Sequence, residues 1–382
     1  MTMANIAFFV SNIDPFIGGT ERVTQSIAEN LVFKGYNTFF VYTNADNHSI
    51  SINKKMRILY SDTVENIVNQ VQQFILINEI RVMIVVNRVF QSVKYQKVFS
   101  LLKKNTNVKI IISLHAAPDS WVNKNKWGLV LPKVYFKESI KSFIFNFYNP
   151  HIRKVIGSYQ VSDKYLLLSK SYIKMFEQTY HIDDKENKLI AIPNPCPFKD
   201  SYNGVARENI VLAVSRMQED QKRIFCMLRI WARIYKYHSD WKLVVVGDGP
   251  DFTTYKQMAS KLSNIMFEGH SSNVQSYYKK SKIFMMTSIW EGLPMTLIEA
   301  MHYGCVPIAF DSFAALYDLI DNGNNGFIIP NNDIDCFVKK ISFMMDNKQY
   351  LEKMSSRILQ HPNIFQMNDI IQIWDHELKK LL

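Results

Sequence analysis

The sequence predicts an α/β protein made of two doubly wound parallel sheets. Short apolar, β-prone runs alternate with amphipathic helical patterns along most of the chain, an order typical of parallel sheets covered by helices. At 382 residues the chain is long enough for two domains with separate cores. Three prolines and a mostly polar stretch at residues 193–208 continue neither a strand nor a helix, and they separate two sets of this alternation.

The first set begins with a predicted strand at residues 4–10, followed by a glycine loop and a helix that runs to about residue 35. Further strands are predicted at residues 36–42, 81–86, 108–114, 165–168 and 189–192, with helical patterns around residues 64–76 and 89–102. The second set has predicted strands at residues 209–215, 241–246, 265–268, 282–287, 306–310 and 326–330. Its predicted helices lie around residues 223–237, 255–262, 274–280, 294–303 and 314–320, and several amphipathic helices follow from residue 333 to the end.

Composition is ordinary for a globular protein, with 47% hydrophobic and 21% charged residues. No apolar run approaches the roughly 20 residues that span a bilayer, and residues 6–10 are too short for a signal peptide, so we expect a cytoplasmic protein. The four cysteines form no CxxC pair or metal-ligand cluster, and we expect them to be reduced and mostly buried.

The net charge of +11 is compatible with nucleic acid, anionic lipid or phosphorylated substrates. Residues 121–160 hold seven Lys or Arg against one acid, with nine aromatic residues among them. Such a segment can lie on an anionic membrane surface, and it can equally be a helix whose apolar face packs internally. It contains no zinc-finger spacing or RNP-like pattern, which argues against a nucleic-acid-binding protein.

The stretch from Ser288 to Gly304 organises the second set. Pro294 suits the first position of a helix and Gly304 the position just past its end, so Glu291 falls on a loop and Glu299 on the helix. A helix that begins where a parallel strand ends offers its free N–H groups to a phosphate, and Gly292 permits close approach of a ligand to the backbone.

Glu291 and Glu299 could then hydrogen-bond the hydroxyls of two different rings, with a phosphate between them, which describes a nucleotide sugar. The alternative for Glu299 is a solvated helix face, because Leu297, Ile298 and Met301 form the apolar stripe.

Arg216 ends a predicted strand, and Lys222 follows after five residues. Two cations at this edge could neutralise a departing diphosphate. The alternative is a solvated pair in a loop that also holds Glu219 and Asp220.

Two features of the first set could also contact a ligand. Gly18 and Gly19 form a turn between the first strand and a helix that Thr20 can cap, and such turns either approach an anion or are purely structural. His115 follows the strand at residues 108–114, at the edge where open α/β sheets bind ligands, although a lone histidine is often structural.

Glu-x7-Glu in the setting EGLPMTLIEAMHYG-x-VPIA resembles the donor-site motif of retaining glycosyltransferases of family 4, which have the GT-B fold. The resemblance extends over most of residues 209–330 and reappears in patches near the N-terminus. It implies two Rossmann-like domains facing across a cleft: an acceptor-side domain at residues 1–195 and a nucleotide-sugar-binding domain at residues 196–365. It further implies a C-terminal helix at residues 366–382 that crosses back to the first domain.

The same resemblance implies a role for each candidate residue. Glu291 would hold the sugar ring and, with His115 facing the transferred sugar, serve catalysis, while Glu299 would hold the ribose. The donor diphosphate would meet Arg216, Lys222, Gly18, Gly19, Leu293 and Pro294, the sugar would also meet Gly292, and the nucleotide would lie near Gly269 and His270.

Asp333 and Asp335 formally make an Asp-x-Asp pattern, which in another glycosyltransferase fold holds a divalent cation. Here the pair follows Pro330-Asn-Asn at a helix start, so N-capping by Asp333 is the favoured interpretation. We therefore expect no metal site and no cofactor.

The resemblance thus implies a retaining glycosyltransferase that moves a hexose or N-acetylhexosamine from a nucleotide sugar to a glycan acceptor, lipid-linked and part of polysaccharide biosynthesis. Ala309-Phe-Asp311 resembles a branch that uses UDP-hexoses, which favours a UDP-sugar. The enzyme would work at the inner face of the plasma membrane. Sugar-nucleotide epimerases share the fold and stay open as an alternative, as does a basic nucleic-acid-binding protein.

Overall fold

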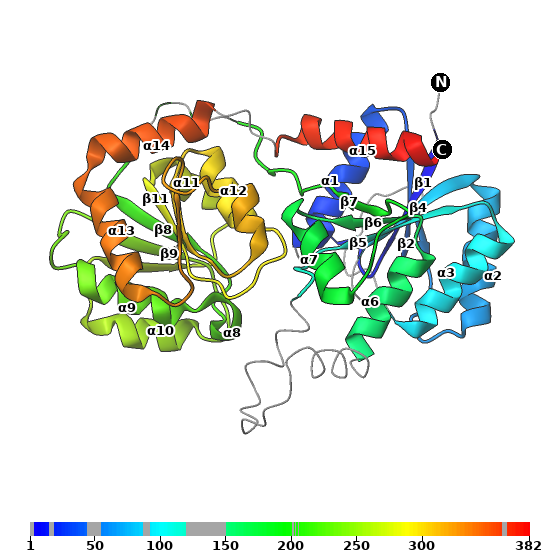
Figure 1. Cartoon of the computed structure of the whole chain (residues 1–382), viewed down its shortest axis with the longest axis horizontal. Coiled ribbons are helices and arrows are strands. Elements are labelled where there is room, and N and C mark those ends of the chain that lie inside the picture. The colour runs from blue at the N-terminus through cyan, green and yellow to red at the C-terminus, as the bar shows by residue number, and fades with distance from the viewer. Residues whose placement is uncertain are drawn as a thin grey trace. The chain divides into compact units, whose positions relative to one another are not determined.

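The computed structural model describes residues 4–14, 19–43, 55–86, 92–119, 150–200, 202, 204, 206–360 and 365–382. The chain divides into two compact units, Met1–Pro195 with Gln366–Leu382, and Cys196–Phe365. Each unit contains one parallel sheet with helices against it, so the predicted α/β class is confirmed (Figure 1).

The sheet of the first unit has seven strands in the order β3-β2-β1-β4-β5-β6-β7, and its described pairs are parallel. The strands are β1 (Asn5–Val10), β2 (Asn37–Tyr42), β3 (Lys55–Arg57), β4 (Ile80–Val86), β5 (Lys109–Leu114), β6 (Lys164–Leu167) and β7 (Leu189–Ala191). The helices are α1 (Gly19–Phe33), α2 (Val64–Ile77), α3 (Val93–Asn105), α6 (Pro150–Val161), α7 (Ser171–Tyr180) and the C-terminal α15 (Met367–Leu381).

The central strands of this unit are buried on both faces, which explains their nearly continuous apolar sequences. Helix α15 lies along α1 (Figure 1). Tyr36 donates a hydrogen bond of 2.7 Å to Asp375 Oδ1, and Arg81 donates one of 2.8 Å to the carbonyl of Leu382. These contacts bind the end of the chain to its first half.

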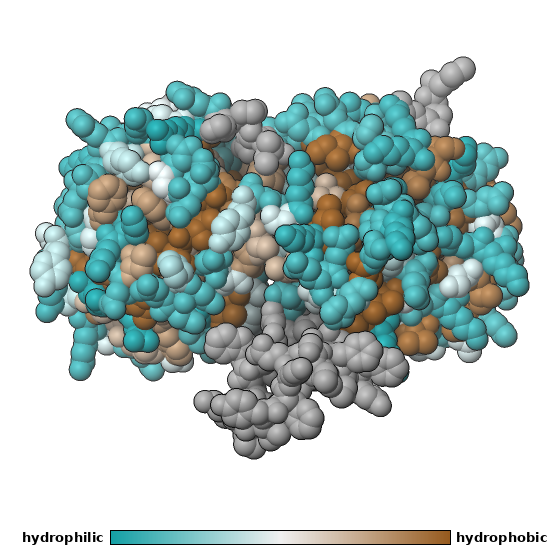
Figure 2. Space-filling model, in the orientation of Figure 1, coloured by the Kyte–Doolittle hydropathy of each residue, from teal (hydrophilic) through white to brown (hydrophobic). Residues whose placement is uncertain are grey.

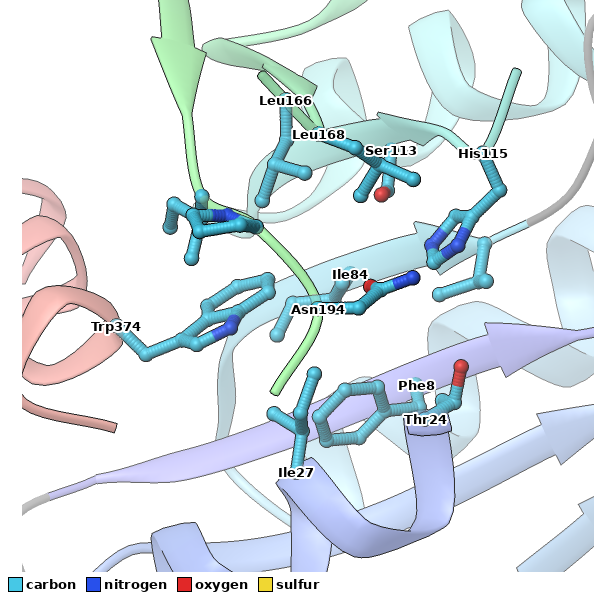
Figure 3. A pocket seen from close by; sticks show the side chains of 13 residues that line it. Phe8, Thr24, Ile27, Ile84, Ser113, His115, Leu166, Leu168, Asn194 and Trp374 are labelled. Carbon is cyan, nitrogen blue, oxygen red and sulfur yellow. The ribbon is translucent and has the colours of Figure 1, made fainter. Parts of the chain in front are cut away.

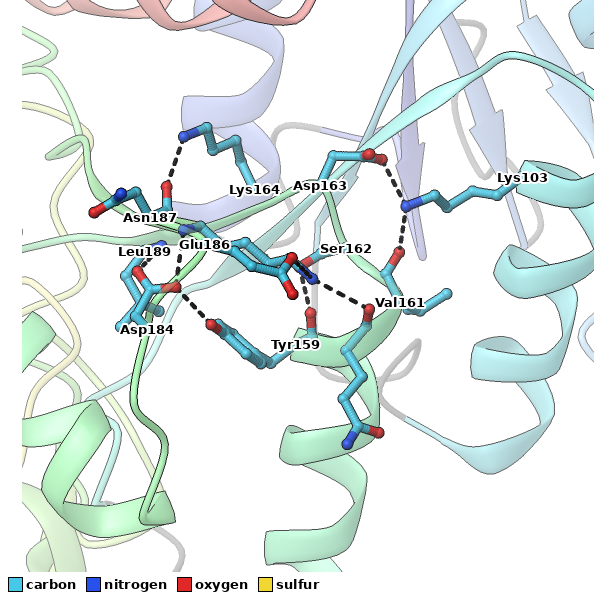
Figure 4. Close-up of polar contacts among 12 residues, drawn as sticks. Lys103, Tyr159, Val161, Ser162, Asp163, Lys164, Asp184, Glu186, Asn187 and Leu189 are labelled. Carbon is cyan, nitrogen blue, oxygen red and sulfur yellow. Dashed lines mark hydrogen bonds and ion pairs between the residues drawn. The ribbon is translucent and has the colours of Figure 1, made fainter.

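A polar network sets where β6 and β7 begin (Figure 4). The Asp163 carboxylate makes an ion pair with Lys103, whose Nζ lies 3.0 Å away. The same carboxylate accepts a hydrogen bond of 2.8 Å from the Ile110 amide. Asp184 accepts hydrogen bonds from the amides of Lys188 and Leu189 at 2.9 and 2.8 Å. The strand starts are thus tied to their neighbours by side-chain carboxylates.

The sheet of the second unit has six strands in the order β10-β9-β8-β11-β12-β13, with parallel described pairs. The strands are β8 (Ile210–Val214), β9 (Lys242–Val246), β10 (Ile265–Gly269), β11 (Ile283–Met286), β12 (Val306–Phe310) and β13 (Phe327–Ile329). The helices are α8 (Glu219–Lys222), α9 (Ile224–Ile234), α10 (Phe252–Met258), α11 (Val274–Lys280), α12 (Met295–His302), α13 (Ile334–Asp346) and α14 (Lys348–Gln360). Their apolar faces enclose a core centred on Trp231 and Trp241.

Two expectations about elements were wrong, and the sequence predicted neither β3 nor α8. Strand β3 was not expected, because its exposed polar residues give no β pattern. The expected helix at residues 314–320 is a 3₁₀-helix, Ala314–Asp318. Helix α1 already begins at Gly19, so Thr20 lies inside it and is not its cap. The helix expected at residues 223–237 is preceded by α8, from which it is separated by Arg223 in a left-handed conformation with φ of 49°.

The visible surface of the described residues is mostly hydrophilic, with apolar residues in separate areas between them (Figure 2). None of the helices in the described ranges combines the length and the apolar sequence needed to cross a bilayer.

Candidate active site

The candidate residues of the second unit gather at its topological switch point. The strand order runs outward in opposite directions from β8 and β11, and ligands of open α/β sheets bind at the carboxyl ends of such a strand pair. Arg216 and Lys222 follow β8, while Glu291 and α12 follow β11. The sheet order therefore brings together two segments that are about 70 positions apart in the sequence.

Lys222 and Glu291 form an ion pair at this edge. Lys222 Nζ lies 2.6 Å from Glu291 Oε1, and the two side chains are only 16% and 10% exposed. The pair is thus largely removed from water, where a charge needs a partner. The interpretation of Lys222 as a solvated loop cation is therefore wrong. For Arg216 the solvated alternative stays open, because this residue is exposed.

Backbone and side-chain hydrogen bonds join the segment that carries Lys222 to the loop that carries Glu291. The amide of Ile289 donates to the Gln221 carbonyl at 2.7 Å, and Thr287 Oγ1 donates to the Lys222 carbonyl at 2.8 Å. Gln221 Nε2 donates to the carbonyl of Trp290 at 3.1 Å. The geometry of the ion pair is therefore set by the fold around it.

Arg223 anchors this junction from the other side. Its Nε donates to the Thr287 carbonyl at 2.7 Å and its Nη2 to the Ser288 carbonyl at 3.2 Å, and its guanidinium lies 4.9 Å from the ring centroid of Phe310. Burial lowers the pKa of Arg223 from its ordinary value. Sequence reasoning missed this residue, because an arginine beside Lys222 gives no sign of its left-handed backbone or of the carbonyls it binds.

Helix α12 differs by one residue from the expectation at its start. Pro294 is the N-cap and Met295 the first helical residue, whereas Pro294 was expected in that first position. The carbonyl of Pro294 accepts hydrogen bonds from the amides of Leu297 and Ile298 at 3.0 and 3.1 Å. Gly292 is partly exposed, while Leu293 and Pro294 are buried, so Gly292 is the most accessible of the three.

The end of α12 is as expected. Gly304 has φ of 72°, and its amide donates to the Met301 carbonyl at 2.8 Å, while the Cys305 amide donates to the Ala300 carbonyl at 3.0 Å. This is a Schellman motif, which requires a left-handed residue at the position of Gly304.

Glu299 is buried, with 7% exposure, so the interpretation of a solvated helix face is wrong. Its Oε2 accepts a hydrogen bond of 2.8 Å from the hydroxyl of Tyr278 on α11. Burial and the neighbouring Glu299 raise the pKa of Tyr278 well above its ordinary value, which keeps the hydroxyl protonated as a donor. Tyr278 therefore orients a carboxylate that points away from bulk water.

The turn after β9 supports the loop that carries Arg216. Gly247 has φ of 132°, and a Cβ there would lie 2.0 Å from the Ser215 carbonyl oxygen, so only glycine fits. Further along the same edge, Gly269 ends β10 with φ of 69°, and the adjacent His270 is exposed.

The remaining candidates belong to the first unit. His115 directly follows β5, as expected, and burial lowers its pKa from 6.5 to about 4, so its ring is neutral at pH 7. Gly19 is the exposed first residue of α1, with open space around it. Gly18 lies outside the described residues, as do residues 121–149 of the basic, aromatic segment.

Asp333 caps α13, since its Oδ1 accepts a hydrogen bond of 2.9 Å from the Cys336 amide, as expected. Asp335 instead pairs with Arg233. Within the described ranges, no group of three or more His, Cys, Asp or Glu side chains is arranged to hold a metal ion.

Residues 198–361 match the family model of glycosyl transferases group 1. An uncharacterized glycosyltransferase of Haemophilus influenzae is 24% identical over 97% of this chain and 99% of its own length. A Campylobacter jejuni relative is described as a GalNAc-alpha-(1->4)-GalNAc-alpha-(1->3)-diNAcBac-PP-undecaprenol alpha-1,4-N-acetyl-D-galactosaminyltransferase. It is 24% identical over 65% of this chain and 68% of its own length.

Solved structures share the whole fold. The lipopolysaccharide outer core galactosyltransferase WaaB in its apo form matches with a TM-score of 0.73 and 19% identity, over 99% of this chain and 100% of that one. Anabaena Alr3699/HepE in complex with UDP also matches with a TM-score of 0.73, at 15% identity, over 98% of this chain and 100% of that one. With its two parallel-sheet units and its group 1 match, this chain is a glycosyltransferase of the GT-B fold.

Proposed function

We propose that this enzyme transfers a hexose or N-acetylhexosamine from a UDP-sugar to a lipid-linked glycan acceptor during polysaccharide assembly. The observation that carries the proposal is the Lys222–Glu291 pair, which places a partly buried cation and a buried carboxylate at the switch point beside the start of α12. The relatives support the substrate classes, since the Campylobacter protein is described by a PP-undecaprenol acceptor and the Anabaena structure contains UDP.

In this mechanism Lys222 changes partners when the donor binds. A departing nucleoside diphosphate builds negative charge on oxygen, and a preorganised cation stabilises that charge more in the transition state than in the ground state. Lys222 and the exposed Arg216 would receive the diphosphate together with the backbone at residues 292–294. Glu291, released from Lys222, would then accept hydrogen bonds from the sugar hydroxyls.

Glu299 would hold the ribose, and the Tyr278 hydroxyl would keep its carboxylate oriented. In the first unit, His115 would contact the transferred sugar as a neutral imidazole, and Gly18 and Gly19 would approach the diphosphate or the acceptor. The nucleotide base would lie near Gly269 and His270. We further propose that transfer proceeds with retention of anomeric configuration, as in family 4.

The side chains at this site are cationic where a metal would otherwise neutralise the diphosphate, so we propose that the reaction needs no metal. Transfer that persists in excess EDTA is the expected result, and a loss restored by Mg²⁺ or Mn²⁺ would refute it.

We also propose that the enzyme works at the inner face of the plasma membrane, with residues 121–160 in contact with anionic lipid. Sedimentation with anionic vesicles at low salt tests this, because such contact weakens as salt rises.

The experiment that tests the function is a thermal-shift screen of nucleotide sugars, followed by product analysis. Selective binding raises the apparent stability by mass action, so the preferred donor should give the largest shift. Transfer of the sugar only when acceptor is present supports the proposal. Conversion of the nucleotide sugar to an isomer without acceptor would instead identify an epimerase.

Two variants separate the roles of the ion pair in donor binding. Lys222→Met should weaken UDP binding about 10-fold or more, since a hydrogen bond to a charged group contributes roughly 1.5–3 kcal/mol. Glu291→Gln should keep UDP affinity or increase it, because it frees Lys222 from its competitor, yet abolish transfer. If both variants weaken UDP equally, Lys222 does not serve the diphosphate.

A further inference from the structure

The first unit contains a small cavity next to His115 that the proposed transfer reaction does not explain. It lies between the sheet and helices α1 and α15, and its lining comes from five strand ends as well as both helices (Figure 3). Its volume is about 10 Å³, close to what a single water molecule requires.

Two buried polar atoms of the lining, Ser113 Oγ and Trp374 Nε1, have no hydrogen-bond partner among the described residues, and Ser113 is the one that lies on a strand. It stands in register with Val86 on β4 and Leu166 on β6, and all three side chains line the cavity. A parallel sheet buried on both faces normally places apolar residues in such a row. Ser113 is 3% exposed, and its Oγ has no hydrogen-bond partner among the described residues, which is costly for a buried hydroxyl.

His115 and Asn194 bring further polar groups to the same space. His115 follows Ser113 by two positions, so both point to the same face of the sheet. Asn194 is 7% exposed, and in Figure 3 its amide points toward the His115 ring. Neither side chain makes a hydrogen bond to another residue within the described ranges.

The chemistry of the lining points to the occupant. It contains no Asp, Glu, Lys or Arg, so it offers no charge to an ion. The hydroxyl, the amide and the neutral imidazole each donate and accept hydrogen bonds, and together they supply the two to four partners that a buried water needs. The cavity is too small for a sugar ring.

We propose that Ser113 and Asn194 hold one buried water that hydrogen-bonds the His115 ring, and that both are therefore positioning residues for His115. The hydrogen bond made by one ring nitrogen decides which tautomer is present, and so what the other nitrogen offers. The consequence for catalysis rests on the proposed function, in which His115 contacts the transferred sugar. The water site itself does not depend on it.

The test uses the full chain with ¹⁵N-labelled histidine, with His115→Gln to assign the ring signals. In the wild type, the ring nitrogens should report one dominant tautomer at pH 7. Ser113→Ala and Asn194→Leu should shift the tautomer ratio, and Ser113→Ala should lower Tm by about 2–4 °C, because the water loses a partner. Thr24→Val is the matched control, since Thr24 Oγ1 lines the same cavity but already donates to the Thr20 carbonyl at 2.8 Å. It should leave the His115 signals unchanged.

If the cavity holds no water, the opposite results are expected. Removing a buried hydroxyl that has no partner would leave Tm unchanged or raise it, and the ring signals would not move. Either result overturns the proposal. Neither the ring signals nor Tm requires transfer activity. A protein without transferase activity would therefore contradict the proposed function, and the same two measurements would still show whether the water is present.

Discussion

Replacing Lys222 by Met should destabilise the second unit by about 2–4 kcal/mol, and adding Glu291→Gln should restore part of that loss. At an effective dielectric constant of about 20, two charges 4 Å apart attract by about 4 kcal/mol, and desolvation offsets much of this. Exposed pairs contribute roughly 0–1 kcal/mol, whereas breaking a buried pair costs roughly 3–5 kcal/mol. Exposures of 16% and 10% place this pair nearer the buried limit.

The double variant should regain stability because the two variants differ in the group that remains at position 291. Lys222→Met leaves the Glu291 carboxylate buried beside an apolar side chain, whereas the double variant leaves a neutral amide. The double variant should therefore be about 1–3 kcal/mol more stable than Lys222→Met, a coupling typical of side chains in direct contact.

Urea unfolding monitored by tryptophan fluorescence measures these differences, because Trp231 and Trp241 lie in the core of the same unit. Arg216→Met is the matched control: it removes a cation from the same edge but from an exposed position, and it should change stability by less than about 0.5 kcal/mol. A double variant less stable than Lys222→Met would refute the reasoning, since the carboxylate would then not be the costly group.

Three further predictions follow from the structure. Gly304→Ala should cost about 2–5 kcal/mol in unfolding free energy, because a Cβ at φ of 72° would also lie 2.6 Å from Arg207 Nη2. Arg223→Gly and Arg223→Ala should both lower stability and kcat by loosening the Glu291 loop, with the alanine variant about 1–2 kcal/mol less stable because it keeps the left-handed strain. Asp375→Asn should cost about 1 kcal/mol at pH 7 and progressively less as the pH falls below about 4.

The sign of the Asp375 prediction follows from its pKa. Burial raises the pKa, but hydrogen bonds from Lys379 and Tyr36 outweigh it and hold the pKa below its ordinary value. A carboxyl group with a lowered folded pKa contributes stability above its unfolded pKa and loses that contribution as the pH falls through the folded value. Unfolding curves of the wild type and of Asp375→Asn from pH 7 to pH 3 measure this effect. A difference in unfolding free energy between the two proteins that grows as the pH falls would contradict the prediction.

The glycine and arginine predictions have internal controls. Gly323 has φ of 83°, and a Cβ there would have no atom within 4 Å, so Gly323→Ala isolates the backbone strain of about 1–2 kcal/mol. Equal costs at Gly304 and Gly323 in chemical unfolding would show that Arg207 moves aside freely. An Arg223→Ala variant as stable as Arg223→Gly would show that the left-handed conformation is not retained.

The fold class and the placement of most elements could be predicted from the order of apolar and polar residues along the chain. The strands at residues 282–287 and 306–310 could be predicted because strands buried on both faces have consecutive apolar residues. The end of α12 at Gly304 followed from the need for a left-handed residue.

Which side chains meet could not be predicted in this way, because it depends on how the elements are arranged in the folded units. The pairing of Lys222 with Glu291, the burial of Glu299 under Tyr278 and the clamp made by Arg223 depend on β8 lying beside β11, which is a property of strand order. The unpartnered Ser113 likewise became visible only when the strand register placed it between Val86 and Leu166. Local propensity acts over a few neighbouring residues, whereas these contacts join segments tens of positions apart, and the energy of each depends on the burial that the finished sheet creates.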